Sequence, residues 1–438
     1  MNYYSTNNPH YTASLSEAVT QGLAPDGGLY MPERIPSIPM AFFKHIGQMS
    51  LQEIAFVVAS TLFGDDIQSD NLKKIVTETL SFDIPLKEVE PGIYALELFH
   101  GPTLAFKDVG ARFMARMLAL FNNEGGDNEN VVNVLVATSG DTGSAVANGF
   151  LDVPGVRVFV LYPQGKVSRI QEAQFTTLGR NITAIEVDGT FDDCQAMVKS
   201  AFIDPSLNSA LTLTSANSIN VARFLPQMFY YFHAYARLAE MGVPVDRLTV
   251  SVPSGNFGNI CSALIAKRMG LNISHFIAAN NRNDVFLQYL LTGKYVPRPS
   301  VQTVANAMDV GNPSNFARIL DLYGGSYDDI CRDISGFTYN DDQILHTVSE
   351  LYNRTGYVLD PHGAVAYRAL KDGIEPGAIG IFLETAHPAK FKSTVDSAIG
   401  TDLPIPSKLA MFMRGEKQTV KMSPQYPALR KFLLNECH

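Results

Sequence analysis

The feature that most constrains this fold is a regular alternation between short apolar runs and helical stretches, which begins at Val131. Runs rich in Val, Ile and Leu that lie between helices are typical of parallel strands whose sheet is covered on both faces. The predicted strands are residues 131–137, 156–161, 182–187, 248–252, 275–279 and 379–384. The predicted helices include residues 168–178, 192–202, 218–241 and 260–269. Two such blocks in one chain predict an α/β protein with two open parallel-sheet lobes and an active-site cleft between them.

Ligands of open parallel sheets bind at the carboxyl ends of the strands. The loops that follow Ala137, Pro253 and Glu384 are therefore the first places to look for a site.

Composition excludes several classes of function. The net charge is −9 and no basic block stands out, which argues against a nucleic-acid partner. No apolar stretch is long enough to cross a bilayer, and the first residues do not resemble a signal peptide, so we expect no membrane partner. The cysteines are scattered, which predicts neither a metal site nor a disulfide framework. We expect a cytoplasmic protein that acts on a small molecule.

Residues 253–259, Pro-Ser-Gly-Asn-Phe-Gly-Asn, follow a predicted strand and precede a predicted helix. Unpaired amide groups at a helix start bind phosphate, and glycine lets the backbone approach it closely. The segment lacks the G-x-x-x-x-G-K-[ST] and G-x-G-x-x-G patterns, so a small phosphorylated ligand fits better than a nucleotide. An ordinary strand–helix turn is the alternative.

Lys107 lies at or just before the first turn of a predicted helix, directly after the apolar residues Leu104, Ala105 and Phe106. An apolar setting and the positive end of a helix both disfavour an ammonium group and so lower the pKa of a lysine. A Schiff-base lysine needs such a lowered pKa. The alternative is a surface lysine beside Asp108, which would cap the helix.

Two further segments place polar groups at predicted helix starts. Residues 138–143, Thr-Ser-Gly-Asp-Thr-Gly, offer hydroxyl and amide groups that suit a carboxylate. Residues 215–223 place Asn217 and Ser218 at a helix start, with Arg223 more than a turn further on, which suits a second phosphate. Ordinary helix capping, with a salt-bridged arginine in the second segment, explains both equally well.

Together these segments resemble the threonine synthase family, and the resemblance covers nearly the whole chain. The pattern F-H-G-P-T-x-A-F-K-D at residues 99–108 is specific for that family, and residues 17–30 match as well. The resemblance implies the type II fold of the pyridoxal-phosphate enzymes, which is tryptophan-synthase-β-like. It also implies an N-terminal domain at residues 1–85 and a catalytic region at 86–438, with a smaller lobe at about 110–215 nested in a larger lobe.

The resemblance also implies a binding site for pyridoxal 5′-phosphate. Lys107 is expected to form the imine link to the cofactor, and Thr385 to face its pyridine nitrogen. Asp141 stands near the cofactor's 3-oxygen, where many relatives carry Asn. The residues expected to hold the cofactor phosphate are Gly255, Asn256, Phe257, Gly258 and Asn259.

The implied substrate is O-phospho-L-homoserine, which water converts to L-threonine and phosphate. Ser139 and Thr142 are expected to contact the substrate carboxylate, and Asn217, Ser218 and Arg223 its phosphate. A serine/threonine dehydratase or phospholyase on the same fold is the first alternative, and a non-catalytic ligand-binding relative is the second. We expect a monomer or a small homo-oligomer.

Overall fold

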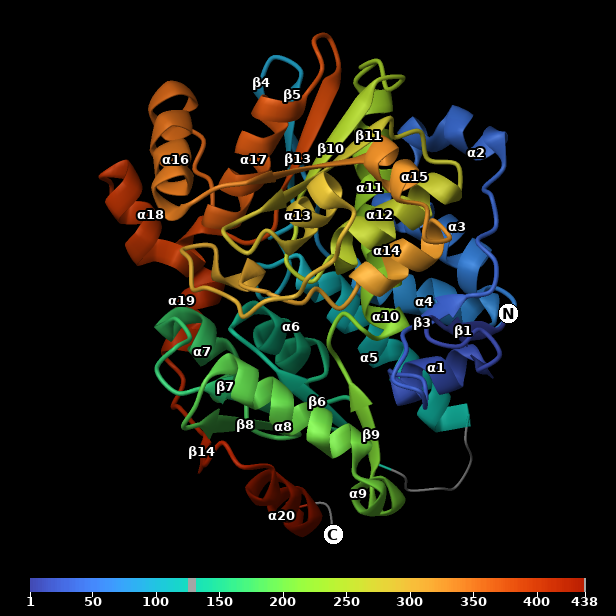
Figure 1. The fold of residues 1–438 in the computed structure, drawn as a ribbon, viewed down its shortest axis with the longest axis vertical. Coiled ribbons are helices and arrows are strands. Elements are labelled where there is room, and N and C mark those ends of the chain that lie inside the picture. The colour runs from blue at the N-terminus through green and yellow to red at the C-terminus, as the bar shows by residue number, and fades with distance from the viewer. Residues whose placement is uncertain (125–130, 437–438) are drawn as a thin grey trace. The chain divides into compact units, whose positions relative to one another are not determined.

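The computed structural model describes residues 1–124 and 131–436 (Figure 1). Contacts divide the chain into two compact units. Unit 1 comprises Met1, Pro32–Phe106 and Phe224–Pro404, whereas unit 2 comprises Asn2–Met31, Lys107–Arg223 and Ile405–His438. The chain therefore changes unit at the Phe106–Lys107 bond and again at the Arg223–Phe224 bond. The first 85 residues contribute to both units, and the expected domain boundaries stay predictions.

A six-stranded sheet forms the centre of unit 1, in the order β12-β11-β10-β13-β5-β4. Its strands are β4 (Leu86–Glu90), β5 (Ile93–Glu97), β10 (Leu248–Pro253), β11 (His275–Asn280), β12 (Ile334–Thr338) and β13 (Ile379–Glu384). All neighbours pair in parallel except β4 and β5. Consequently the carboxyl ends of β10, β13 and β5 lie at one edge of the sheet.

Helix α17 (Pro361–Gly373) lies against β10, β11 and β13, and α16 (Asp341–Thr355) packs on α17 and on α18 (Lys392–Ile399). Their buried apolar side chains form one core with the strands. The other helices of unit 1 are α2 (Met40–His45), α3 (Leu51–Phe63), α4 (Ser69–Thr79), α11 (Phe229–Glu240), α12 (Gly258–Arg268), α13 (Val285–Thr292), α14 (Phe316–Leu322) and α15 (Tyr327–Asp333).

Unit 2 is built on a five-stranded, wholly parallel sheet in the order β14-β8-β7-β6-β9. Its strands are β6 (Val132–Ala137), β7 (Val156–Pro163), β8 (Ile182–Val187), β9 (Thr212–Ser215) and β14 (Val420–Met422). Further elements of the N-terminal segment are β1 (Tyr3–Ser5), β2 (Thr12–Ala13), β3 (Tyr30–Pro32) and α1 (Leu15–Gln21).

Helices cover both faces of this sheet, as its continuous apolar strands require. Leu135, Phe159 and Ile185 share a core with α8 (Phe191–Ile203) and α20 (Tyr426–Glu436). Helix α6 (Asp141–Gly149) packs on β6 and β7 and also contacts α5 (Lys107–Glu124) and α7 (Arg169–Thr176). Unit 2 also contains α9 (Pro205–Ala210) and α19 (Ser407–Met413).

The single helix predicted for residues 218–241 is wrong. The structure has a short α10 (Val221–Phe224), a 3₁₀ turn over Leu225–Met228, and then α11. Pro226 explains the interruption, because proline lacks the amide hydrogen that a continuous helix needs and its ring collides with the preceding turn. Asn217 and Ser218 therefore precede the first helical residue.

His233 on α11 makes the stability of unit 1 dependent on pH. The side chain is buried, and its Nε2 lies 2.9 Å from the carbonyl oxygen of Ile84. Burial is the main cause that lowers the pKa of His233 to about 4. The unfolded chain takes up this proton near pH 6.5, so it binds more protons than the folded chain between about pH 6.5 and 4. Folding free energy is therefore lost as the pH falls through this window.

We expect His233→Gln to reduce this acid sensitivity. Between pH 7 and pH 5 the variant should lose about 1–2 kcal/mol less unfolding free energy than the wild type, because glutamine takes up no proton. Urea unfolding at both pH values measures the difference. His346→Gln, at an exposed position on α16, is the matched control and should behave like the wild type. Equal pH dependence in all three proteins would contradict the prediction.

Candidate active site

The loop after β10 packs so closely against neighbouring backbone that there is no room for a side chain at residue 255. A Cβ atom on Gly255 would lie 2.8 Å from the Cα of Met308 and 3.1 Å from the carbonyl oxygen of Ala307. The loop is fixed to the sheet as well, since Ser254 donates its amide to Ala279 (2.8 Å) and accepts from the Asn280 side chain (2.8 Å). These contacts give the loop the form of a compact cradle made of backbone atoms.

Phe257 turns the chain from this loop into α12. Its φ of +62° lies in the left-handed region, which a bulky residue adopts only when its surroundings impose it. The buried ring packs against Phe286, with 4.6 Å between ring centroids, and this contact holds the conformation. Phe257 occupies the N-cap position and carries no polar side-chain atom, so it leaves the first amide groups of α12 available to an anion.

Asn259 supplies a further donor in the first turn of α12. Its side chain is buried, and its Oδ1 accepts a hydrogen bond from the Tyr231 hydroxyl. Within residues 1–124 and 131–436, its Nδ2 has no hydrogen-bond partner. A buried amide without an acceptor costs free energy, and a phosphate oxygen in the cradle would satisfy it.

Asn256 anchors the loop to the chain segment before α14. Its backbone oxygen accepts from the amide (3.2 Å) and the side chain (2.9 Å) of Asn315. Its Oδ1 accepts from the amide of Ser314 at 3.3 Å. Sequence reasoning missed Ser314 and Asn315, because only the folded chain brings a segment so distant in sequence to the loop.

Thr385 follows β13 and lies at the same edge of the sheet as the glycine loop, since β13 and β10 pair in parallel. Its carbonyl oxygen accepts the amide of Phe106 at 2.9 Å, and the amide of His387 donates to Leu104 at 3.1 Å. Leu104 has a φ of +56°, so this turn is also in a left-handed conformation. The residue that follows Phe106 is Lys107, so unit 1 brings the glycine loop, Thr385 and the approach to Lys107 to one sheet edge.

The loop after β6 in unit 2 is organised by Thr138. Its Oγ1 accepts from the amides of Gly140 (2.9 Å) and Gly143 (2.8 Å), and Gly140 occupies the N-cap position of α6. Ser139 and Thr142 are therefore not the residues that cap α6. The ordinary capping that the sequence left open is present in this segment at Thr138, whose Oγ1 accepts the amide of Gly143 in the first turn of α6.

Asp141 begins α6 and is buried. Its Oδ1 accepts a hydrogen bond from Nε2 of Gln171 at 2.9 Å. Gln171 in turn lies so close to Gly140 that a Cβ atom there would meet its side-chain amide at 2.6 Å. Sequence reasoning missed Gln171, which lies on α7.

The segment after β9 lies beside the Thr138 loop of unit 2. Nδ2 of Asn217 donates to the carbonyl oxygen of Ala137 at 3.3 Å, which places Asn217 beside the start of the Thr138 loop. Arg223 is buried and donates to the carbonyl oxygen of Ala216. A Cβ atom on Gly110, in the first turn of α5, would collide with the carbonyl oxygen of Arg223.

Lys107 is the first residue of α5, as the sequence predicted. Unit 2 therefore brings Arg223 next to the helical turn that Lys107 begins, and Asn217 next to the loop of Ser139 and Thr142. Ser218 lies between Asn217 and Arg223 in the same segment. The expected site residues thus form two groups, one at the carboxyl edge of each sheet.

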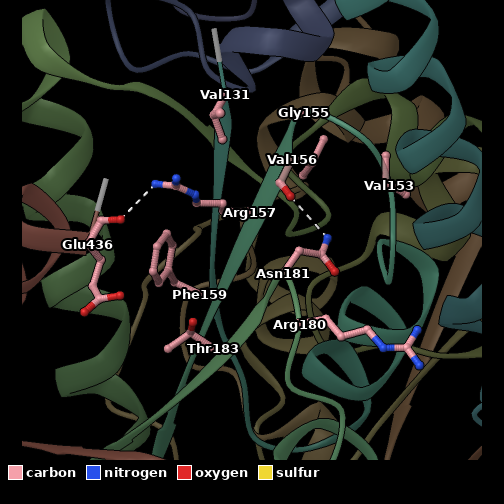
Figure 2. A pocket seen from close by; sticks show the side chains of 10 residues that line it. All are labelled: Val131, Val153, Gly155, Val156, Arg157, Phe159, Arg180, Asn181, Thr183 and Glu436. Carbon is pink, nitrogen blue, oxygen red and sulfur yellow. Dashed lines mark hydrogen bonds between the residues drawn. The ribbon is translucent and has the colours of Figure 1, made fainter. Parts of the chain in front are cut away.

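A pocket of about 530 Å³ lies at the opposite edge of the unit 2 sheet (Figure 2). It is lined by the first residues of β7 and β8 and by Glu436, whose carbonyl oxygen accepts from Nη1 of Arg157 at 2.9 Å. None of the expected site residues lines it.

No described helix has the length and apolar character needed to span a membrane. Among the described residues, no group of three or more His, Cys, Asp and Glu side chains is arranged to hold a metal ion.

Comparison with known proteins gives matches over the full length. The family described as pyridoxal-phosphate dependent enzyme matches residues 76–383, threonine synthase N terminus matches residues 2–80, and threonine synthase, C-terminal, matches residues 363–433. The threonine synthase of Serratia marcescens is 41% identical over 434 residues, which cover 99% of each chain.

Two solved structures are similar throughout. The crystal structure of threonine synthase from Escherichia coli matches with a TM-score of 0.92 and 41% identity over all of both chains. The structure of PLP-bound threonine synthase from Brucella melitensis matches with a TM-score of 0.92 and 32% identity over 99% of each chain. The predicted α/β fold of the type II pyridoxal-phosphate enzymes, with pyridoxal phosphate as cofactor, is confirmed by these matches. This chain belongs to the threonine synthase family.

Proposed function

We propose that this chain converts O-phospho-L-homoserine and water to L-threonine and phosphate. Its family membership supports a carbon–oxygen lyase of this type. The observation that carries the choice of substrate is the packing of Arg223 against the first turn of α5, three residues from Lys107. An arginine there supplies a phosphate site separate from the glycine loop, which already accounts for the phosphate of the cofactor.

The residues of unit 1 fit pyridoxal phosphate. Gly255 lets the Ala307–Met308 turn pack directly against the loop backbone, and the Nδ2 of Asn259 lacks an acceptor within the described chain. In the proposal, the phosphate of the cofactor is held by Asn256, Phe257 and Gly258 together with these two residues. When bound, the cofactor stores the negative charge that develops on the substrate carbon.

The other cofactor contacts come from three side chains. Thr385 offers a neutral hydroxyl to the pyridine nitrogen, which need not stay protonated as it would opposite a carboxylate. Asp141 is the residue we propose for the 3-oxygen of the cofactor. Lys107 would hold the cofactor covalently, and its amine would move protons at Cα and Cβ of the substrate as a general base and acid.

The residues of unit 2 orient the substrate. Ser139 and Thr142 hold its carboxylate, and Asn217, Ser218 and Arg223 hold its phosphate, which leaves from Cγ. Water then adds at Cβ, so these residues must also keep stray water from the earlier steps.

The finer points of organisation are part of the same proposal. The family match at residues 2–80 supports an N-terminal domain ending near residue 85. The assignment of Lys107–Arg223 to unit 2, between two segments of unit 1, supports a smaller lobe of about 110–215 nested in the rest. The described cysteines Cys194, Cys261 and Cys331 are free thiols, which suits a reducing cytoplasm. We propose a monomer or a small homo-oligomer.

The two alternatives differ from this proposal in measurable ways. A dehydratase or phospholyase would use Lys107 and the glycine loop without needing the Arg223 site. A non-catalytic relative would need neither the lysine nor the cofactor. Phosphate release from O-phosphohomoserine, with threonine detected as the product, separates all three.

We expect Lys107→Ala to abolish turnover while the protein stays folded. Loss of the general base alone costs about 10²–10⁴-fold, and loss of the covalent link adds to it. Phosphate release measures the rate, and the mass of the borohydride-reduced protein shows whether the cofactor is attached. Lys199→Ala, at an exposed position on α8, is the control and should keep both properties. A Lys107→Ala protein with a tenth of the wild-type rate would exclude the assignment.

We expect Gly255→Ala to weaken cofactor binding. The new Cβ would force the backbone at Met308 away or shift the loop, and overpacking of this kind costs about 1–3 kcal/mol, or about 5- to 150-fold in affinity. Titration of the apoprotein with pyridoxal phosphate gives the dissociation constant. Gly336→Ala on β12 is the matched control, because the close contacts of its Cβ would be with the flexible ends of Leu290 and Leu287, and the Leu287 backbone would lie at an ordinary 3.6 Å. Equal affinity in both variants would show that the loop is not the cradle.

We expect Arg223→Leu to lower kcat/KM for O-phosphohomoserine by about 10- to 150-fold, which corresponds to a charge-assisted hydrogen bond of about 1.5–3 kcal/mol. Lysine at this position should rescue only part of the loss, because it lacks the planar fork of arginine. Any side activity on L-serine should change much less, since that substrate has no phosphate. Arg157→Leu, at the pocket on the opposite edge, is the control. Equal losses on both substrates would give Arg223 a structural role instead.

A further inference from the structure

Three buried polar side chains of unit 1 have no part in the function proposed above. Glu384 is the last residue of β13 and directly precedes Thr385, Asp360 is the N-cap of α17, and His362 lies in the first turn of that helix. Their exposed fractions are 0%, 0% and 2%. Of these three residues, the sequence indicates a role only for Asp360, as a helix N-cap, because Asp followed by Pro is a common helix start.

Asp360 is the centre of this group. Its Oδ1 accepts from the amide (2.8 Å) and from Nδ1 (2.6 Å) of His362, and its Oδ2 accepts from the amide of Gly363 (3.3 Å). Its own amide donates to Oε2 of Glu384 at 3.4 Å. These bonds require that Nδ1 of His362 carries the hydrogen, so Nε2 is left as an acceptor.

That acceptor is used by the segment that packs on the glycine loop. The amide of Ala307 donates to Nε2 of His362 at 3.2 Å. Ala307 and Met308 belong to the turn Asn306–Met308, whose backbone lies against Gly255. A continuous path of contacts therefore runs from Glu384, beside Thr385, through Asp360 and His362 to Gly255.

The charge states in this group follow from its burial. Burial, reinforced by the negative charge of Asp360, raises the pKa of Glu384 well above its usual value. Complete burial acts to raise the pKa of Asp360, but the hydrogen bonds that His362 donates hold it below its usual value. Glu384 is thus a neutral acid and Asp360 a carboxylate, because two adjacent buried carboxylates do not both stay ionised without strong compensation.

The neighbouring strand does not change this assignment. Glu97 on β5 stands opposite Glu384 in the register and is paired with Lys87 (2.8 Å) and His100 (2.7 Å). Those partners hold the pKa of Glu97 below its usual value. Its negative charge adds to the forces that keep the proton on Glu384.

We propose that Asp360 and His362 are positioning residues that hold the Ala307–Met308 turn against Gly255 and keep the phosphate cradle at a fixed spacing from Thr385. Glu384 serves them as a neutral hydrogen-bonding partner. This inference rests on the proposed function, in which the glycine loop and Thr385 contact opposite ends of one cofactor. The group acts through backbone and touches neither cofactor nor substrate.

The first test uses a pair of substitutions that separate ring packing from hydrogen bonding. His362→Phe keeps the ring that packs on Phe391 but removes both nitrogens, whereas His362→Gln keeps an acceptor for the amide of Ala307. We expect the dissociation constant of apoprotein for pyridoxal phosphate to rise about tenfold or more in His362→Phe. In His362→Gln it should stay within about threefold of the wild type. Affinities equal to wild type in both variants would overturn the proposal.

The second test examines the charge of Glu384. Glu384→Gln replaces a neutral acid by a neutral amide of the same shape, so the dissociation constant should stay within about twofold. Asp360→Asn removes the charge that fixes the His362 tautomer and should weaken binding as much as His362→Phe. A loss in Glu384→Gln as large as that in Asp360→Asn would show that a charged Glu384 is needed and would overturn the neutral assignment.

The third test needs no variant and so does not depend on whether one folds. Deuterium exchange of the wild-type apoprotein should show the amide of Ala307 already protected, because it donates to Nε2 of His362. Fast exchange of Ala307 in the apoprotein, with protection only after pyridoxal phosphate is added, would overturn the proposal. Failure of the proposed function has a different signature, because the wild type itself would then not bind pyridoxal phosphate or release phosphate from O-phosphohomoserine.

Discussion

The parallel pairing of β10 with β13 is the constraint on which the candidate site depends. Parallel strands end at the same edge of a sheet, so the loop of Gly255 and the segment of Thr385 become neighbours although about 130 residues separate them. The hydrogen bond from Phe106 to Thr385 then fixes the approach to Lys107 at the same edge. Each of these positions follows from strand order and backbone hydrogen bonds rather than from contacts between the site side chains.

Two of the four non-glycine residues with positive φ in the described chain lie in the candidate site, whereas Asp152 and Arg180 lie outside it. Leu104 and Phe257 both adopt the left-handed region, next to the lysine motif and within the glycine loop respectively. Each is held by its surroundings, through the backbone contact with His387 in one case and the packing on Phe286 in the other. Strain that the rest of the fold overcomes is common where a backbone must be pre-shaped for a ligand.

Much of the fold was predictable because strand patterns are local. The bounds of β8 and β13 match the prediction to the residue, and α5 begins at Lys107 as expected. The helix expected over residues 218–241 is interrupted at Pro226, because the apolar pattern continues through a residue that a helix interior does not accept. The group of Glu384, Asp360 and His362 was not predictable, because a buried acid is recognised only when its distant partners are known. The same holds for Gln171 beside Asp141 and for Asn315 beside Asn256.

The edge strand β14 has a consequence for how this protein is made. It pairs with β8 across more than 230 residues of sequence, and α20 behind it completes the core on α8. During synthesis the outer edge of β8 and the apolar face of α8 remain exposed until almost the whole chain has left the ribosome. Exposed edges and apolar faces of this kind promote aggregation of incomplete chains. Truncation by a few dozen residues at the carboxyl end should therefore harm the yield of folded protein far more than its distance from the chemistry would suggest.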